Sequence, residues 1–186
     1  MKLIVFCGPS GSGKTSIKNF LLATNSQLAF SVSATTRPMR EFEKHGVDYY
    51  FISIEEFKAK ISNNEFIEWE EVYANGFYGT LKSEIERINK AGRVTVFDVD
   101  VEGGLHIKES FGDKCLAVFV RPPSITELHK RLVKRGTETD ESLRKRVAKA
   151  ELEMTYEKYF DRVIINNDFD LACEMSGQLV TKFLNE

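Results

Sequence analysis

The chain has 186 residues, with 26 Lys and Arg against 28 Asp and Glu, so its formal net charge is −2 with neutral histidines. This balance argues against a general nucleic-acid or membrane-surface binder, because such proteins usually carry a strong excess of basic residues. Hydrophobic residues make up 42% of the chain, which is typical of a folded domain, and no apolar run approaches the roughly 20 residues that span a bilayer. We therefore expect a single domain over 1–186, a monomer or simple homo-oligomer, with no nucleic-acid or membrane partner.

The first predicted strand, at about residues 3–7, leads directly into a glycine-rich loop. The loop has the G-x-x-x-x-G-K-[ST] pattern and reads Gly8-Pro9-Ser10-Gly11-Ser12-Gly13-Lys14-Thr15. Its glycines let backbone N–H groups surround an anion, Lys14 adds positive charge near the β- and γ-phosphates, and the Thr15 hydroxyl can bind Mg²⁺. The loop therefore predicts binding of ATP or a similar triphosphate, and the alternative is a glycine-rich turn that binds no nucleotide.

Strand and helix patterns alternate along most of the chain. After the first strand, apolar runs predict buried strands at about residues 28–32, 94–98, 115–120 and 162–165. Helical patterns lie at about residues 15–23, 82–91, 103–110, 124–135, 141–157 and 169–184. The alternation indicates an α/β fold: a three-layer sandwich with a mostly parallel five-stranded sheet and ligands at the carboxyl ends of its strands.

Two segments interrupt this alternation. Residues 34–80 contain aromatic-rich strand patterns and only one short helix, which indicates a small β-rich insertion over the main sheet. Residues 135–146 include a polar break flanked by arginines, which we interpret as a short helical lid that closes onto phosphates. The core of the domain would then comprise residues 1–33, 81–134 and 147–186.

A longer pattern within the insertion is far more specific. The segment Thr35-Thr36-Arg37-Pro38-Met39-Arg40-Glu41-Phe42-Glu43-Lys44-His45-Gly46-Val47-Asp48-Tyr49-Tyr50-Phe51 resembles the signature of guanylate kinases, T-[ST]-R-x-x-[KR]-x-x-[DE]-x-x-G-x-x-Y-x-[FY], at every fixed position. Similar blocks follow in the family's order, among them Phe66-Ile67-Glu68-Trp69, Tyr78-Gly79-Thr80 and Ile165-Asn166-Asn167-Asp168. The resemblance covers essentially the whole chain. It implies a P-loop nucleoside monophosphate kinase that moves the ATP γ-phosphoryl group to GMP, giving ADP and GDP.

The acceptor phosphate carries two charges, which favour paired arginines because a planar guanidinium binds two oxygens at once. Arg37 and Arg40, three residues apart beside a proline, have this character. In the family the matching arginines hold the GMP phosphate, and tyrosines matching Tyr49 and Tyr78 donate their hydroxyls to it. Glu43, at the acidic position of the signature, is expected to belong to the same GMP site.

Recognition of guanine needs an acceptor, because the base presents N1–H and N2–H₂ donors side by side. An ionised carboxylate accepts both, so Glu68 is the expected guanine reader, although an isolated glutamate at this place could equally face solvent. The resemblance adds Ser33 and Thr80 near guanine O6, Gly79 in the same block as Thr80, and Asp100 as a further contact to the base.

Asp98 ends the strand predicted at 94–98, where an acidic residue would face Mg²⁺ held near Thr15 and contact it through water. No general base is needed, because the attacking phosphate oxygen is already ionised at neutral pH, so alignment and charge neutralisation must carry the transfer. The expected catalytic residues are therefore cations: Lys14, Arg37, Arg40, Arg131, Arg135 and Arg146. The resemblance also places Asn166 near ATP.

Two other functions stay open. One is a guanylate-kinase-like interaction module without catalysis, which the complete phosphate loop and the arginines disfavour. The other is a kinase for a different nucleoside monophosphate, or a small GTPase, although the N-K-x-D segment of GTPases is absent. Whether dGMP is also an acceptor is left open. Three dispersed cysteines without disulfide or metal spacing favour a reducing, cytoplasmic setting.

Overall fold

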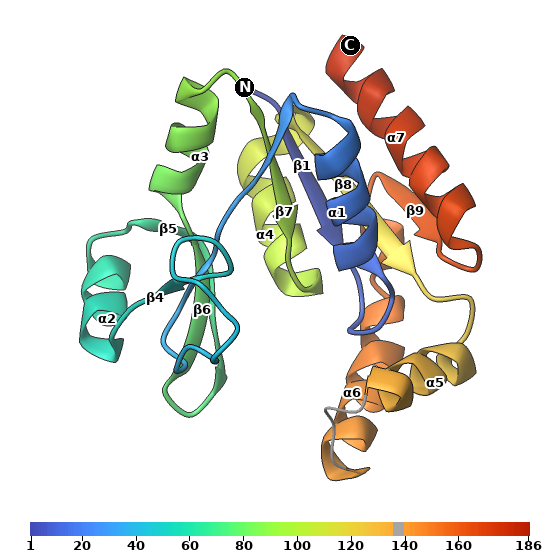
Figure 1. Cartoon of the computed structure of the whole chain (residues 1–186), viewed down its shortest axis with the longest axis horizontal. Helices are drawn as coiled ribbons and strands as arrows, with labels where there is room; N and C mark the ends of the chain where they lie inside the picture. Colours follow the sequence, from blue (N-terminus) through green and yellow to red (C-terminus); the bar gives the residue numbers. More distant parts are fainter. Residues whose placement is uncertain (136–139) are drawn as a thin grey trace.

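The computed structural model describes residues 1–135 and 140–186, apart from the side chains of Tyr73 and Arg135. Its main sheet has five strands in the order β2-β7-β1-β8-β9, and every pairing is parallel (Figure 1). These strands are β1 Leu3–Cys7, β2 Leu28–Phe30, β7 Val94–Asp98, β8 Cys115–Arg121 and β9 Arg162–Ile165. The predicted α/β fold with a parallel five-stranded sheet is confirmed.

Helices cover both faces of this sheet, because alternate side chains of each strand point to opposite sides. In β1, Ile4 and Phe6 pack with α1 and α7, whereas Leu3 and Val5 pack with α3 and α4. Figure 1 shows α1 and α7 side by side on one face and α4 on the other. The helices span α1 Lys14–Thr24, α3 Lys82–Lys90, α4 Val101–Phe111 and α7 Phe169–Asn185.

A second, mixed sheet has four strands in the order β4-β3-β6-β5. They are β3 Ala34–Thr35, β4 Tyr50–Phe51, β5 Phe66–Tyr73 and β6 Gly76–Leu81. Helix α2 Ile54–Ser62 covers this sheet with Phe57, whose ring stacks on Phe66 at 4.3 Å and on Phe77 at 5.3 Å between centroids. The small sheet therefore has an aromatic core of its own, apart from the two cores of the main sheet.

Helices α5 Ile125–Arg135 and α6 Asp140–Met154 pack on each other through Leu128, Leu132 and Ala150. The lid predicted at 135–146 falls partly on residues 136–139, which lie outside the described residues, and on the first part of α6. Short 3₁₀ turns at Gly112–Lys114 and Glu157–Tyr159 complete the elements. No helix in the described ranges is long and apolar enough to cross a membrane.

One predicted strand and one predicted helix extended too far at their C-terminal ends. β2 ends at Phe30, because Ser31 gives its last sheet bond to Val96 and the Val32 N–H then bonds the Glu84 carboxylate at 3.0 Å. Helix α6 ends at Met154 rather than 157, because the next N–H groups, from Thr155 onward, bond carbonyls only three residues back. In both cases a local hydrogen bond replaces the regular ladder.

Candidate active site

A cavity of about 610 Å³ lies where the two sheets and α6 meet. Its lining unites residues predicted for the donor phosphates, the acceptor and the metal: Gly8, Ser10, Lys14, Ser33, Tyr49, Glu68, Tyr78, Gly79, Asp98, Asp100 and Arg146. The remaining predicted residues whose side chains are described do not line it: Pro9, Gly11, Ser12, Gly13, Thr15, Arg37, Arg40, Glu43, Thr80, Arg131 and Asn166. The side chain of Arg135 lies outside the described residues.

The glycine-rich loop joins the end of β1 to the start of α1, and its glycines are required by geometry. Gly8 has φ +138°, and a Cβ there would lie 2.3 Å from the Val120 carbonyl oxygen. Gly13 has φ +93°, and its Cβ would lie 2.1 Å from the Asn166 amide nitrogen. Both conformations favour glycine, so the loop can fold tightly with its N–H groups beside the start of a helix.

Two cationic side chains lie at this loop, one from the loop itself and one from α6. Lys14 Nζ lies 3.4 Å from the Pro9 carbonyl oxygen, within its own loop. Arg146, on α6, donates from Nη1 to the Ser10 hydroxyl at 3.0 Å. A helix distant in sequence thus places a guanidinium at the loop.

Asn166 and Arg131 support the loop from behind. The buried Asn166 side chain donates to the Ser12 carbonyl at 2.7 Å, and the backbone carbonyl of Asn166 accepts from Arg131 Nη2 at 3.0 Å. The amide that was expected near ATP is therefore engaged with the loop backbone. Arg131 also contacts Glu127, at 3.4 Å, so in this structure its guanidinium is held by Glu127 and the Asn166 backbone.

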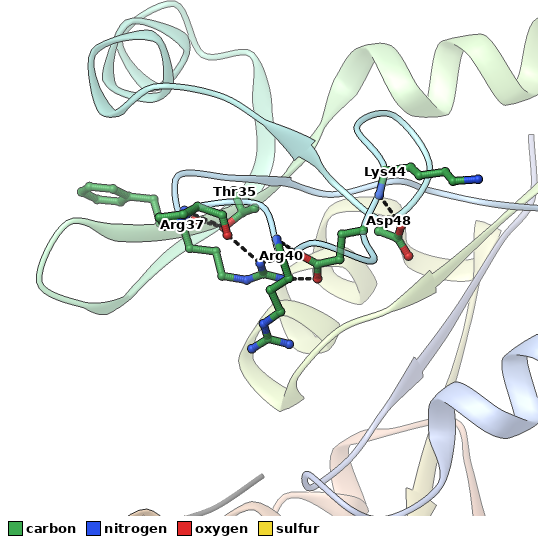
Figure 2. Close-up of polar contacts among 8 residues, drawn as sticks. Thr35, Arg37, Arg40, Lys44 and Asp48 are labelled. Carbon is green, nitrogen blue, oxygen red and sulfur yellow. Dashed lines mark hydrogen bonds and ion pairs between the residues drawn. The ribbon is translucent and has the colours of Figure 1, made fainter.

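In the insertion, Arg37 and Glu43 form a two-point ion pair (Figure 2). Arg37 Nη1 lies 2.7 Å from Glu43 Oε2, Nη2 contacts Oε1, and the Arg40 backbone N–H donates to the same carboxylate at 2.8 Å. Hydrogen bonding to Arg37 lowers the pKa of Glu43 to about 2. The carboxylate therefore faces the arginines, and Figure 2 shows the Arg40 side chain extending away from it.

Alternate side chains of β5 line one part of the cavity. Glu68, Glu70 and Val72 all line the cavity, because every second side chain of a strand points to the same face. Glu68 pairs across the sheet with the fully buried Thr80. Burial raises the pKa of Glu68, an effect that Thr80 offsets in part. A half-buried acceptor at this place has the chemistry that guanine donors require.

Asp98 stands at the end of β7, and its carboxylate Oδ2 lies 3.9 Å from Lys18 Nζ. Lys18 is on α1, one turn after Thr15, and its side chain is buried over the Phe30 ring, with Nζ 3.7 Å from the centroid. Thr15 is exposed at the start of the same helix. The hydroxyl and the carboxylate are thus supplied by adjacent elements at one edge of the sheet.

Sequence reasoning missed four charged residues that line the cavity: Glu70, Lys145, Lys149 and Glu153. Glu70 was detectable, because strand alternation from Glu68 places it on the same face. Lys149 had a weaker signal, lying three residues after Arg146 on the predicted helix and hence on the same helix face.

The fold and the cavity define a class of protein: a P-loop nucleotide-binding enzyme whose phosphate loop faces a second polar pocket in one cavity. A guanylate kinase family model matches residues 1–182. A guanylate kinase of Bacteroides thetaiotaomicron is 52% identical over 185 residues, covering 100% of this chain and 91% of that protein. One of Porphyromonas gingivalis is 47% identical over 184 residues, covering 98% of each chain.

The fold agrees with these relatives. The crystal structure of guanylate kinase from Anaplasma phagocytophilum has a TM-score of 0.77 and 30% identity, covering 97% of this chain and 85% of that one. The chain belongs to the guanylate kinase family and is a nucleotide-binding kinase, a transferase. The resemblance drawn from the signature segment is confirmed.

Proposed function

We propose that the protein transfers the γ-phosphoryl group of ATP to GMP within the cavity, giving ADP and GDP. One observation carries this proposal: Lys14 and the phosphate loop at one end share a cavity of about 610 Å³ with Glu68 and Tyr78 at the other. Two substrates bound at these ends would face each other with their phosphates between them. Binding energy would then be used for alignment, which is the main requirement of phosphoryl transfer.

At the donor end, the loop backbone and Lys14 would hold the β- and γ-phosphates. Arg146 approaches the same loop from α6, with Nη1 3.0 Å from the Ser10 hydroxyl, so it would add a second cation beside the transferred group. Arg131 and Arg135 are proposed to complete this charge when both substrates are bound. Asn166, held to Ser12, would act on ATP by fixing the loop.

At the acceptor end, Arg37 and Arg40 would bind the GMP phosphate, with the hydroxyls of Tyr49 and Tyr78. The rings of these tyrosines lie 5.9 Å apart, edge to face, so the two hydroxyls come from neighbouring side chains. Glu43 would act through Arg37, because its carboxylate fixes the guanidinium and not the substrate.

The base of GMP would be read by Glu68, with Ser33, Gly79, Thr80 and Asp100 around it. Guanine N1–H and N2–H₂ would donate to the Glu68 carboxylate, and an adenine in the same place would leave that buried acceptor without donors. Such a site favours guanine over adenine by roughly 10⁴-fold or more in kcat/KM.

The donor set near the loop fits Mg²⁺. Thr15 offers a hydroxyl and Asp98 a carboxylate, which are hard oxygen ligands. Among the described residues, no group of three or more His, Cys, Asp and Glu is placed to hold a metal ion, and Mg²⁺ bound with a nucleotide needs only one or two protein ligands besides phosphates and water. When bound there, the ion would neutralise phosphate charge. Thr15 would contact it directly and Asp98 through water.

An acceptor panel tests the proposal. We expect ADP release from ATP and Mg²⁺ to require GMP or dGMP, and AMP, CMP, UMP and dTMP to be at least about 10⁴-fold poorer in kcat/KM. Glu68→Gln should raise KM for GMP and leave KM for ATP unchanged. Equal turnover of AMP or dTMP would overturn the assignment of Glu68.

A further inference from the structure

One face of α6 contacts both ends of the cavity. Arg146 and Lys149 are three residues apart and so lie on the same side of the helix. Arg146 contacts Ser10 in the phosphate loop at 3.0 Å. Lys149 Nζ lies 3.4 Å from Oδ2 of Asp100, which begins α4 and belongs to the acceptor pocket. A shift of α6 therefore moves both contacts together.

Lys149 is surrounded by carboxylates. Besides Asp100 it contacts Glu153 Oε1 at 3.8 Å, and Glu70 on β5 lines the same cavity, where burial and the charge of Asp100 raise its pKa. Asp100 is fixed from its other side, since Oδ1 caps α4 by accepting the Gly103 N–H at 2.9 Å. Lys149 thus contacts two carboxylates, and a third carboxyl group, that of Glu70, lines the cavity beside them.

We propose that Lys149 is a positioning residue that couples occupation of the acceptor pocket to the placement of Arg146 at the phosphate loop, and that Glu70 on β5 contributes through its effect on Asp100. This inference rests on the proposed function, because it assumes that guanine binds beside Asp100. Neither residue needs to touch the substrates. Lys149 acts through its contact with Asp100 and through α6, and Glu70 acts through Asp100.

The physical basis is competition for the same carboxylates. Guanine brings N–H donors into the pocket, and these would satisfy part of the negative charge that Lys149 otherwise balances. Lys149 then shifts away from Asp100. Because Lys149 and Arg146 share one rigid helical face, the same movement changes the position of the Arg146 guanidinium beside the donor phosphates.

Binding measurements test this coupling without turnover. The affinity of the non-hydrolysable analogue AMPPNP with Mg²⁺ is measured by calorimetry with and without saturating GMP, in wild type, Lys149→Met and Lys149→Arg. We expect GMP to tighten AMPPNP binding by about 5-fold or more in wild type, a common size for coupled sites. Lys149→Met should bring that ratio to within about 2-fold of unity, while Lys149→Arg keeps most of it.

Lys145→Met is the matched control, since Lys145 is one turn earlier on α6, lines the same cavity and pairs with Glu141 at 2.7 Å. It removes the same charge without touching Asp100 and should preserve the ratio. Glu70→Gln should lower the ratio by less than Lys149→Met, and it carries the test if Lys149→Met does not fold.

The outcomes separate the two proposals. Unchanged coupling in Lys149→Met, or equal loss in Lys145→Met, overturns the inference and leaves the proposed function intact. A wild-type ratio of one also overturns it. Failure of the wild-type protein to bind GMP contradicts the proposed function and the inference together.

Discussion

Arg37 and Glu43 meet edge to edge, with both terminal nitrogens of the guanidinium on the two carboxylate oxygens. The side chains are 12% and 7% exposed, so the pair is formed largely away from solvent. The same guanidinium lies 5.1 Å from the centre of the Tyr49 ring. Glu43 thus orders in advance one of the arginines proposed to bind the acceptor phosphate, which would reduce the entropy lost when an acceptor binds.

The first prediction concerns this pair and substrate affinity. Glu43→Gln removes the charge and one of two parallel hydrogen bonds, so Arg37 should lose its fixed orientation. We expect KM for GMP to rise by about 10-fold, with KM for ATP unchanged, in a steady-state assay. Glu41→Gln, at an exposed position of the same loop, is the control and should behave as wild type. Equal increases for both nucleotides would argue against a specific role for Glu43.

The same variant has a defined pH dependence. The pKa of Glu43 is lowered from 4.5 to about 2, chiefly by hydrogen bonding to Arg37. A carboxylate with a depressed native pKa stabilises the fold above its ordinary pKa, and this stabilisation is lost as the pH falls through the native value. The difference in melting temperature between wild type and Glu43→Gln should therefore be constant above about pH 5 and vanish near pH 2. Melting curves across this range check it, and a pH-independent difference would contradict it.

A further prediction addresses the phosphate loop. Lys14→Ala should lower kcat by at least about 100-fold, because a preorganised charge beside the transferred group is lost. The fold should persist, since the Lys14 ammonium group makes only a long contact, of 3.4 Å, to the Pro9 carbonyl oxygen. Circular dichroism and the ADP-release assay measure the two effects separately. Near-normal turnover of a folded Lys14→Ala protein would refute the proposed donor site.

These residues show what the sequence could predict. The apolar runs and the glycine-rich loop define buried strands and a phosphate site through local rules, and the structure places Lys14 and Glu68 in one cavity, as expected. The partner of Lys149 could not be predicted, because Asp100 is 49 residues away in sequence and meets it only through the tertiary fold. Likewise, a signature pattern names Glu43 but does not tell whether its carboxylate faces the substrate or Arg37.

For Glu70 we predict a pH dependence of stability opposite in sign to that of Glu43. Burial and the neighbouring charge of Asp100 raise its pKa to about 7, Glu102 adds to this, and Lys149 opposes it. The native protein then holds a proton that the unfolded chain has released, so stability should fall as the pH rises from about 4.5 through about 7. Glu70→Gln should remove that loss, making the variant more stable above pH 7 by less than about 1 kcal/mol, since the group is partly solvated.

Urea unfolding of wild type and Glu70→Gln at pH 5 and pH 8 measures this effect. Glu71→Gln, one residue later and on the opposite face of β5, is the matched control and should show no comparable gain at pH 8. If Glu70→Gln were less stable than wild type at pH 8, the carboxylate would be favourably placed in its ionised form, and the sign of this prediction would be wrong.

The last prediction concerns the buried pair of Lys18 and Asp98, whose side chains are 8% and 11% exposed and whose charged atoms are 3.9 Å apart. Lys18→Met keeps much of the side-chain volume but leaves the Asp98 carboxylate without its cation, which should cost about 1–3 kcal/mol of the free energy of unfolding. Lys18→Met with Asp98→Asn removes both charges and should recover more than half of that loss, because an uncompensated carboxylate is more costly than a neutral pair. The double-mutant cycle in urea gives the coupling directly. Additive losses would show that Lys18 stabilises the fold through the Phe30 ring and not through Asp98.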